Sequence, residues 1–240
     1  MTAPAGVIVT MDGPAGTGKS SVAWKLAQRL GLEVLDTGAM YRAAAVVALD
    51  EGVPADDGVA LAARIAEEGL AFDWSFRPPR LLLGGRDLTE RIRDADVNVA
   101  VSVVARQPAL RAAMVEAQRA IGRAHPRLVT EGRDQGSVVF PDAIVRFYLD
   151  AHPEVRARRR VDQMRAQGRP ADYEAVLRAI QQRDHLDETR VDGPLVCASG
   201  AQRIDTSGLT LDQVVLELER RARVVVPSHL LAPPRAVQPA

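Results

Sequence analysis

Residues 6–30 read GVIVTMDGPAGTGKSSVAWKLAQRL, and this stretch decides the fold. Its first six residues form a continuous apolar run rich in β-branched side chains, which is typical of a strand buried on both faces. Ser20 to Leu30 carries apolar residues at helical spacing and ends before Gly31, a suitable helix C-cap. A strand, a glycine-rich turn and a helix in this order predict a parallel α/β sheet.

Residues 13–20 fit the pattern G-x-x-x-x-G-K-[ST] of a phosphate-binding loop. The glycines let backbone N–H groups approach polyphosphate oxygens, and the helix that follows presents its positive end to the same anion. Lys19 supplies a cation for the β- and γ-phosphates, and the Ser20 hydroxyl can ligate Mg²⁺. A turn that only caps a strand is disfavoured, because a buried strand precedes the motif and an amphipathic helix follows it. The motif therefore predicts that ATP and Mg²⁺ are bound by Gly13, Pro14, Ala15, Gly16, Thr17, Gly18, Lys19, Ser20 and Ser21.

The composition excludes several other classes of protein. Lys plus Arg and Asp plus Glu both number 31, and this balance argues against binding to duplex nucleic acid or to an anionic membrane. No apolar run approaches the roughly 20 residues of a membrane span, and the first ten residues lack the basic region of an export signal. The single Cys197 excludes an intramolecular disulfide and a multi-cysteine zinc site. We expect a cytoplasmic protein without a nucleic-acid or membrane partner.

Beyond residue 30 the pattern alternates between α/β and α+β segments. Further strands are expected at 33–35, 70–74, 80–83, 128–131, 144–149 and 203–205. Further helices are expected at 39–49, 57–68, 95–105, 108–123, 153–167, 173–186 and 211–224. From Pro227 the composition is rich in Pro and Ala, which favours a disordered tail.

A phosphate-binding loop alone leaves three classes of nucleotide-dependent protein open. A GTPase normally recognises guanine with N-K-x-D, and Asn98, the only Asn, is followed by Val99. A motor ATPase would have an apolar strand ending in Asp-Glu, whereas Asp150 is followed by Ala151. A small kinase needs an acceptor pocket and arginines that neutralise the transferred phosphoryl group, and this requirement is met.

Three further segments accompany the phosphate-binding loop: DTGAMYR at 36–42, EGRDQGSVVFPDA at 131–143 and RDHLDETR at 183–190. Together the four resemble the bacterial cytidylate kinases, a family of P-loop nucleoside monophosphate kinases. The resemblance runs from about Val7 to Val224 and implies phosphorylation of CMP and dCMP by ATP. It also implies a monomer with an α/β, three-layer P-loop fold: a parallel β-sheet core, an α+β monophosphate-binding insertion and a helical lid.

The resemblance also implies boundaries for these parts. The core would comprise 1–40, 125–150 and 191–226, the insertion 41–124 and the lid 151–190. Residues 227–240 would form the disordered tail.

Roles for individual side chains come from the same resemblance. Catalysis would depend on the cations Lys19, Arg133, Arg183 and Arg190. The CMP phosphate would be contacted by Arg42, Arg133 and Arg190, with Tyr41 beside it and Thr37 where the family commonly has Ser. The cytosine edge would be read by Ser102, Arg111 and Asp134, because a carboxylate accepts from the amino group and an arginine donates to the ring acceptors. Arg183 and Asp187 would hold the sugar hydroxyls.

The expected lid contains the run Arg158-Arg159-Arg160. Each residue advances about 100° around a helix, so at most two of the three can face ATP, and we favour Arg158. Two rival functions remain open: another small P-loop kinase, and a nucleic-acid-associated NTPase that uses this run. The low aromatic content of 4% argues against the second. For Asp12, a water-mediated Mg²⁺ contact and a simple turn role are both open.

Overall fold

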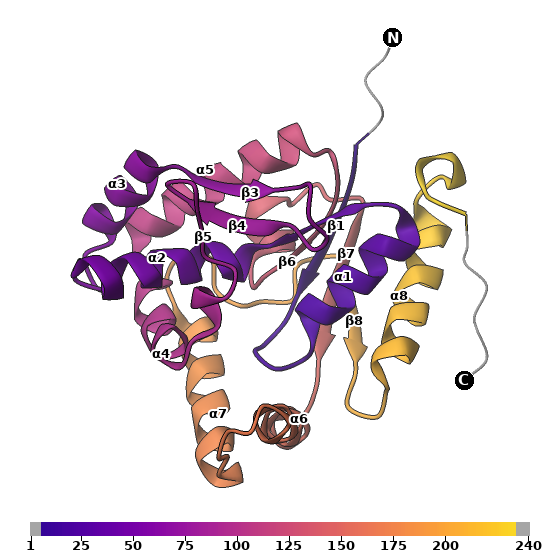
Figure 1. Ribbon diagram of the computed structural model, residues 1–240. Helices are drawn as coiled ribbons and strands as arrows, with labels where there is room; N and C mark the ends of the chain where they lie inside the picture. The colour runs from indigo at the N-terminus through magenta and orange to yellow at the C-terminus, as the bar shows by residue number, and fades with distance from the viewer. Residues whose placement is uncertain (1–5, 234–240) are drawn as a thin grey trace. The chain divides into compact units, whose positions relative to one another are not determined.

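The computed structural model describes residues 6–233, which form two compact units (Figure 1). The P-loop unit contains the described residues up to Val34 and from His125 onward. The 35–124 unit spans Leu35–Ala124. The expected lid segment, 151–190, therefore belongs to the same compact unit as the phosphate-binding loop.

The P-loop unit is built on a five-stranded parallel sheet in the order β2-β6-β1-β7-β8. The strands are β1 (Val7–Asp12), β6 (Arg127–Glu131), β7 (Val145–Asp150), β8 (Gln202–Asp205) and β2 (Glu33–Asp36), whose last two residues belong to the 35–124 unit. The helices are α1 (Lys19–Leu30), α6 (Pro153–Ala166), α7 (Tyr173–Thr189) and α8 (Leu211–Val225), with a 3₁₀ turn at Ser228–Leu230. The central strand β1 pairs in parallel with β6 and β7, so the segments that follow these strands meet at one edge of the sheet.

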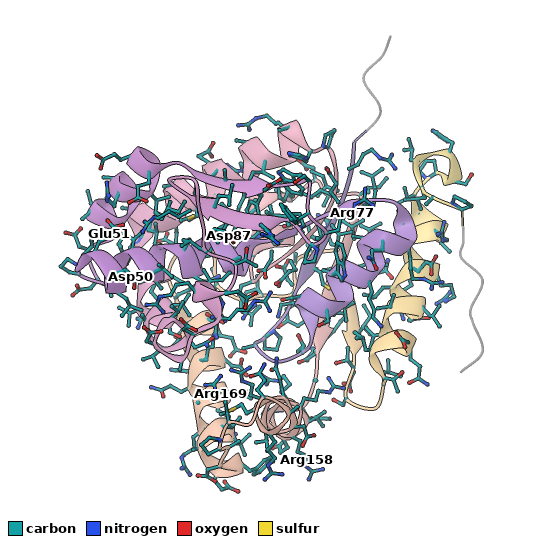
Figure 2. All side chains as sticks on the ribbon, viewed as in Figure 1. Asp50, Glu51, Arg77, Asp87, Arg158 and Arg169 are labelled. Atoms are coloured by element: carbon teal, nitrogen blue, oxygen red, sulfur yellow. The ribbon has the colours of Figure 1, made fainter. Side chains whose placement is uncertain are left out.

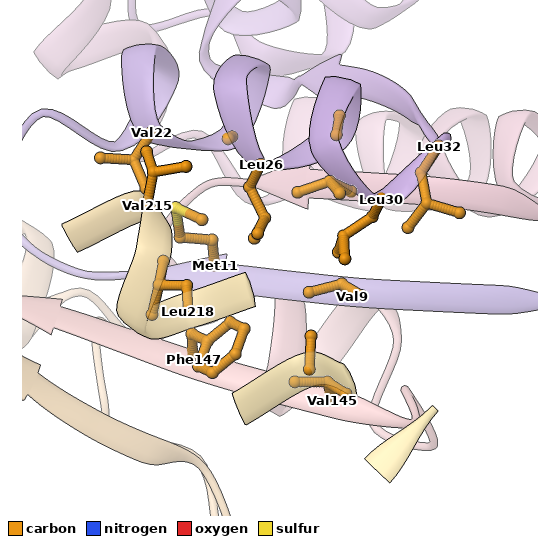
Figure 3. Close-up of a cluster of buried hydrophobic side chains, with 14 of the residues drawn as sticks. Val9, Met11, Val22, Leu26, Leu30, Leu32, Val145, Phe147, Val215 and Leu218 are labelled. Carbon is orange, nitrogen blue, oxygen red and sulfur yellow. The ribbon is translucent and has the colours of Figure 1, made fainter. Parts of the chain in front are cut away.

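One face of this sheet is sealed by α1 and α8. Figure 3 shows Leu26 and Leu30 of α1, Leu218 of α8 and Phe147 of β7 packed in one buried apolar cluster. Apolar side chains three and four positions apart on each helix fall on the same face, which explains why α1 lies along the sheet. The packing fixes the start of α1, and with it the phosphate-binding loop, at the end of β1.

The 35–124 unit combines a small antiparallel sheet with helices. The sheet has the order β3-β4-β5, from β3 (Leu70–Asp73), β4 (Arg80–Leu83) and β5 (Arg86–Asp87). The helices are α2 (Thr37–Glu51), α3 (Gly58–Glu68), α4 (Ala95–Val104) and α5 (Pro108–Ala124), with a 3₁₀ turn at Arg91–Arg93. The side chains of Asp36 and Asp57 cap α2 and α3, accepting from the backbone N–H groups of Ala39 and Ala60.

The expectation of a disordered tail from Pro227 is wrong for the residues that the structure describes. Leu231 is buried in the core cluster, and the N–H of Ala232 donates to the carbonyl of Leu30 at 2.9 Å. The Arg223 guanidinium donates to the carbonyl of Ala232 at 2.8 Å. One apolar side chain and hydrogen bonds to α1 and α8 order a segment whose composition resembles a linker. Residues 234–240 lie outside the described residues.

Among residues 6–233, no helix is both long enough and apolar enough to span a membrane.

Candidate active site

The phosphate-binding loop joins β1 to α1 and owes its shape to three glycines with positive φ. These are Gly13 (144°), Gly16 (81°) and Gly18 (86°). A Cβ on Gly13 would lie 2.0 Å from the carbonyl oxygen of Leu149, so β7 leaves no room for a side chain there. The loop has the open backbone that polyphosphate binding requires.

Lys19 opens α1 and is 5% exposed. Its Nζ donates to the carbonyl oxygen of Pro14 at 2.7 Å and to Oγ1 of Thr17 at 3.4 Å. Burial is the main cause that lowers the pKa of Lys19 to about 7, and the nearby Arg133 guanidinium lowers it further. Neighbouring carboxylates oppose this shift. The ammonium group folds back over the loop, and an incoming anion would restore the charge that burial disfavours.

Ser20, the expected metal ligand, and the adjacent Ser21 are exposed in the first turn of α1. Oγ of Ser20 donates to Oε1 of Glu131 at 2.7 Å, and Glu131 is buried at the end of β6. Among residues 6–233 no group of three or more His, Cys, Asp or Glu side chains is placed to hold a metal. Mg²⁺ in nucleotide sites typically takes one or two protein oxygens together with phosphates and water, and a hydroxyl backed by a carboxylate fits that requirement.

Asp12 has a structural role at the end of β1. Its two carboxylate oxygens accept from the backbone N–H groups of Gln135, at 2.8 Å, and Gly136, at 2.7 Å. Burial raises the pKa of Asp12 to about 6 despite these hydrogen bonds. The carboxylate anchors the short π-helical turn Gln135–Val139, which the sequence pattern did not predict.

That turn follows Arg133 and Asp134, which take part in a cluster of charges in the P-loop unit. Nε of Arg133 donates to Oδ2 of Asp187 at 2.9 Å. Arg190 lies 3.8 Å from Asp187 and 3.9 Å from Asp134, measured between guanidinium nitrogens and carboxylate oxygens. Although burial alone would raise it, the pKa of Asp187 is lowered by Arg133, Arg183 and Arg190. Three of the expected substrate residues, Arg133, Arg183 and Arg190, therefore surround the ionised carboxylate of Asp187.

The three arginines of the expected lid run lie in different surroundings. Arg158, the favoured ATP ligand, is exposed on α6 (Figure 2). Arg159 is tied to the loop after β8, where it donates to the carbonyl of Thr206 at 2.6 Å, and Arg160 donates to Gln163 at 2.7 Å. The arginine of α6 that contacts the phosphate-binding loop is Arg156, which donates to the carbonyl of Ala15 at 2.9 Å.

In the 35–124 unit, two of the expected CMP residues are neighbours. The guanidinium carbon of Arg111 lies 5.5 Å from the centroid of the Tyr41 ring, and Arg111 is 3% exposed. Nη1 of Arg42 donates to Oδ1 of Asn98 at 2.6 Å. Asn98 shares α4 with Ser102, and Thr37 is buried at the start of α2.

Sequence reasoning missed four residues with a clear place in these clusters: Glu131, Asn98, Arg156 and Asp184, the last of which lies 2.7 Å from Arg156. Glu131 and Asp184 lie in the segments 131–143 and 183–190, in which other residues were assigned to the substrate. Their place in these segments was the only sequence signal of a role. Asn98 served only to exclude a GTPase. Nothing local distinguishes Arg156 from the arginines that follow it.

Comparison with known proteins gives a consistent picture. A family model described as cytidylate kinase matches residues 9–223. The cytidylate kinase of Rhodococcus jostii (strain RHA1) is 49% identical over 211 residues, 87% of this chain and 91% of that protein. The cytidylate kinase of Nocardia farcinica (strain IFM 10152) is 47% identical over 214 residues, 89% of this chain and 92% of that protein. The cytidylate kinase of Mycobacterium leprae (strain Br4923) is 43% identical over 212 residues, 88% and 93% respectively. Because the family model covers most of the chain and these relatives are 43–49% identical over nearly their whole length, the chain belongs to the cytidylate kinase family.

Proposed function

We propose that the protein transfers the γ-phosphoryl group of ATP to CMP or dCMP, giving ADP and CDP or dCDP. The observation that carries the proposal is that two cations, the buried Lys19 and the largely buried Arg133, lie near each other. Asp187 holds Arg133 in place by an ion pair. Two polyanions repel each other, and a kinase must supply cations that neutralise both. Family membership supports the choice of cytosine nucleotide.

The reaction needs positioning more than acid–base chemistry. An oxygen of the CMP phosphate forms a bond to the γ-phosphorus while the bond to the bridging oxygen of ADP breaks, so no covalent enzyme intermediate is required. A phosphate oxygen is already nucleophilic and requires no general base. The histidines agree with this: His152, His185 and His229 are exposed, and His125 pairs with Glu33 at 2.8 Å.

Each residue then has a defined task. The loop amides and Lys19 bind the β- and γ-phosphates, and Ser20 would hold Mg²⁺, which supplies further charge neutralisation when bound. Arg133, Arg183 and Arg190 stabilise the charge of the transferred group, and Asp134 accepts from the cytosine amino group. Asp187 holds the sugar hydroxyls together with Arg183. Arg158 remains our proposed lid contact with ATP.

The residues of the 35–124 unit keep the assignments that the family resemblance implies. We assign Arg42 to the CMP phosphate, with Thr37 and Tyr41 in the same pocket, and Ser102 and Arg111 to the base. The segment 151–190 is proposed as a lid that excludes water and suppresses ATP hydrolysis. We also propose that the protein is cytoplasmic and monomeric. Sedimentation velocity of the purified chain would test the monomeric state.

The direct test is ADP release from MgATP measured with CMP, dCMP, UMP, AMP and GMP as acceptors, and with RNA as a further arm. We expect turnover with CMP and dCMP well above the other nucleotides. Stimulation by RNA but not by CMP would instead identify a nucleic-acid-dependent NTPase. Turnover confined to another acceptor would identify a different small kinase.

A further inference from the structure

Arg156 and Asp184 form a buried ion pair at the side of the phosphate-binding loop. Nη1 of Arg156 lies 2.7 Å from Oδ2 of Asp184, and the two residues are 3% and 9% exposed. Nε of Arg156 also donates to the carbonyl of Ala151 at 2.8 Å. One guanidinium therefore contacts the segment before α6, the carboxylate of α7 and, through Ala15, the phosphate-binding loop.

The backbone of α6 lies close to the loop at this point. A Cβ placed on Gly16 would be 3.3 Å from Cβ of Arg156, so a side chain there would crowd the arginine. The fork geometry of arginine allows it to serve several acceptors at fixed angles, which a lysine ammonium cannot do.

Asp184 and Asp187 are three residues apart on α7, and this spacing places both on neighbouring positions of one helix face. Each pairs with an arginine from a different segment: Asp184 with Arg156 of α6, and Asp187 with Arg133 of the loop after β6. Helix α7 is thus linked to the phosphate-binding loop through Arg156 and, one turn later, directly to Arg133.

The pair is costly to bury. Burial raises the pKa of Asp184 even though Arg156 opposes the shift, and Oδ1 of Asp184 is buried without a hydrogen-bond partner among the described residues. Two apolar side chains would often stabilise a fold equally well or better than such a pair. A positioning role accounts for a charged pair at this place.

We infer that the Arg156–Asp184 pair positions α7 so that Asp187 holds Arg133 in line with the phosphate-binding loop. In this assignment the pair acts through Arg133 and has no chemical part in the transfer. This inference rests on the proposed phosphoryl transfer, and it assigns a role to two residues that the reaction chemistry alone does not require.

The test compares Asp184→Asn and Arg156→Lys with the wild type in CMP-dependent ADP release. Asp184→Asn keeps the side-chain shape and avoids leaving a buried carboxylate unpaired. We expect kcat to fall on the order of 10²-fold, since a misplacement of about 1 Å has this effect, with little change in KM. Arg165→Ala is the control, because Arg165 is exposed on the same helix, and it should match the wild type.

A double-mutant cycle separates positioning from a general loss of stability. If the pair acts through Arg133, adding Asp184→Asn to Arg133→Lys should lower kcat by less than about threefold further, because the two changes share one effect. Full multiplication of the two effects would overturn the inference. A change in KM for ATP alone, with kcat unchanged, would also overturn it.

Hydrogen–deuterium exchange of the ligand-free protein keeps this test distinct from that of the proposed function. Asp184→Asn should increase exchange both in α7 and in residues 131–139, whichever nucleotide is the acceptor. Faster exchange in α7 alone would show that the pair only stabilises its own helix. If the wild type failed to phosphorylate CMP while both segments responded, the proposed function would fail and the positioning role would stand.

Discussion

Two aspartates, one in each unit and each paired with an arginine, show how solvent exposure changes the effect of an ion pair. Asp96 in the 35–124 unit lies 2.8 Å from Arg91 at the surface, and hydrogen bonding to that arginine lowers its pKa. Asp184 in the P-loop unit lies 2.7 Å from Arg156, yet burial raises its pKa. Nearly identical ion-pair distances thus shift the pKa in opposite directions, and solvent access decides the sign.

The contrast extends to the neighbouring charges. In the 35–124 unit, Arg91 also pairs with Asp50, and Arg64 pairs with Glu51. Both are surface pairs, and the two carboxylates lie next to each other in sequence at the end of α2 (Figure 2). In the P-loop unit, Lys19 and Asp12 are buried and their pKa values are displaced toward 7 and 6. Charges held against their solvation preference are typical of sites that bind or transform charged ligands. The following predictions test whether burial separates functional from ordinary charges.

The largest effect is expected at Lys19, one of the two lysines of the chain. Lys19→Met removes the buried charge that meets the β- and γ-phosphates, and we expect kcat/KM to fall on the order of 10³-fold or more. Lys25→Met is the matched control, since the Lys25 side chain lies 43% exposed in the same helix and pairs with the surface residue Asp212. A Lys19→Met protein that folds and turns over near the wild-type rate would contradict the assignment of the loop.

A smaller effect is expected for the choice of base. With Asp134 as acceptor, the amino group of cytosine is matched, whereas UMP would place a carbonyl against a carboxylate. We expect kcat/KM for CMP to exceed that for UMP by about tenfold to a hundredfold. Asp134→Ala should narrow this ratio by impairing CMP, whereas Arg111→Ala should impair both nucleotides less selectively. Equal rates of CMP and UMP phosphorylation by the wild type would refute the polarity argument.

Stability in the P-loop unit should follow apolar burial and not the active-site charges. Leu231→Ala empties a position at the edge of the core cluster, and we expect it to lower the free energy of unfolding by roughly 2 kcal/mol with activity unchanged. Val224→Ala, at a side chain that is 79% exposed, is the control. Chemical denaturation measures both, and equal stability of the two variants would mean that residues 227–233 do not support the core.

The smallest effect is expected at the surface ion pairs. Arg91→Ala removes contacts to Asp50, Asp94 and Asp96, but such pairs are screened by water and contribute little. We expect activity and melting midpoint equal to those of the wild type within error. A marked loss of activity would show that burial does not separate the two groups of charges.

The parts of the molecule that local pattern determines were predictable. The motif of residues 13–20 and its flanking periodicity predicted β1, the loop and α1, and Gly31 caps α1 as expected. The antiparallel strands of the 35–124 unit were also predicted, except β5, whose two residues are too few to show an alternation.

What could not be predicted depends on contacts between segments distant in sequence. The phase of α6 decides which arginine contacts the loop in the ligand-free protein, and packing sets that phase, so the contact of Arg156 with Ala15 could not be predicted. The hydroxyl of Ser20 donates to Glu131, which lies 111 positions away in the sequence. Ala232 is hydrogen-bonded to Leu30 of α1 and to Arg223 of α8. Composition is a poor guide to the segment from Pro227, because one buried leucine and two hydrogen bonds order its described part.

The central claim is that burial keeps Lys19 poised for a polyphosphate, and the protons taken up on ATP binding measure this directly. At about pH 8, a lysine with a pKa of about 7 is mostly neutral, and contact with phosphates should raise its pKa and restore the charge. Titration calorimetry of MgATP in buffers of different ionisation enthalpy should show uptake approaching one proton, which fades toward pH 6 and is lost in Lys19→Met. Binding of MgATP to the wild type at pH 8 without proton uptake would contradict the account.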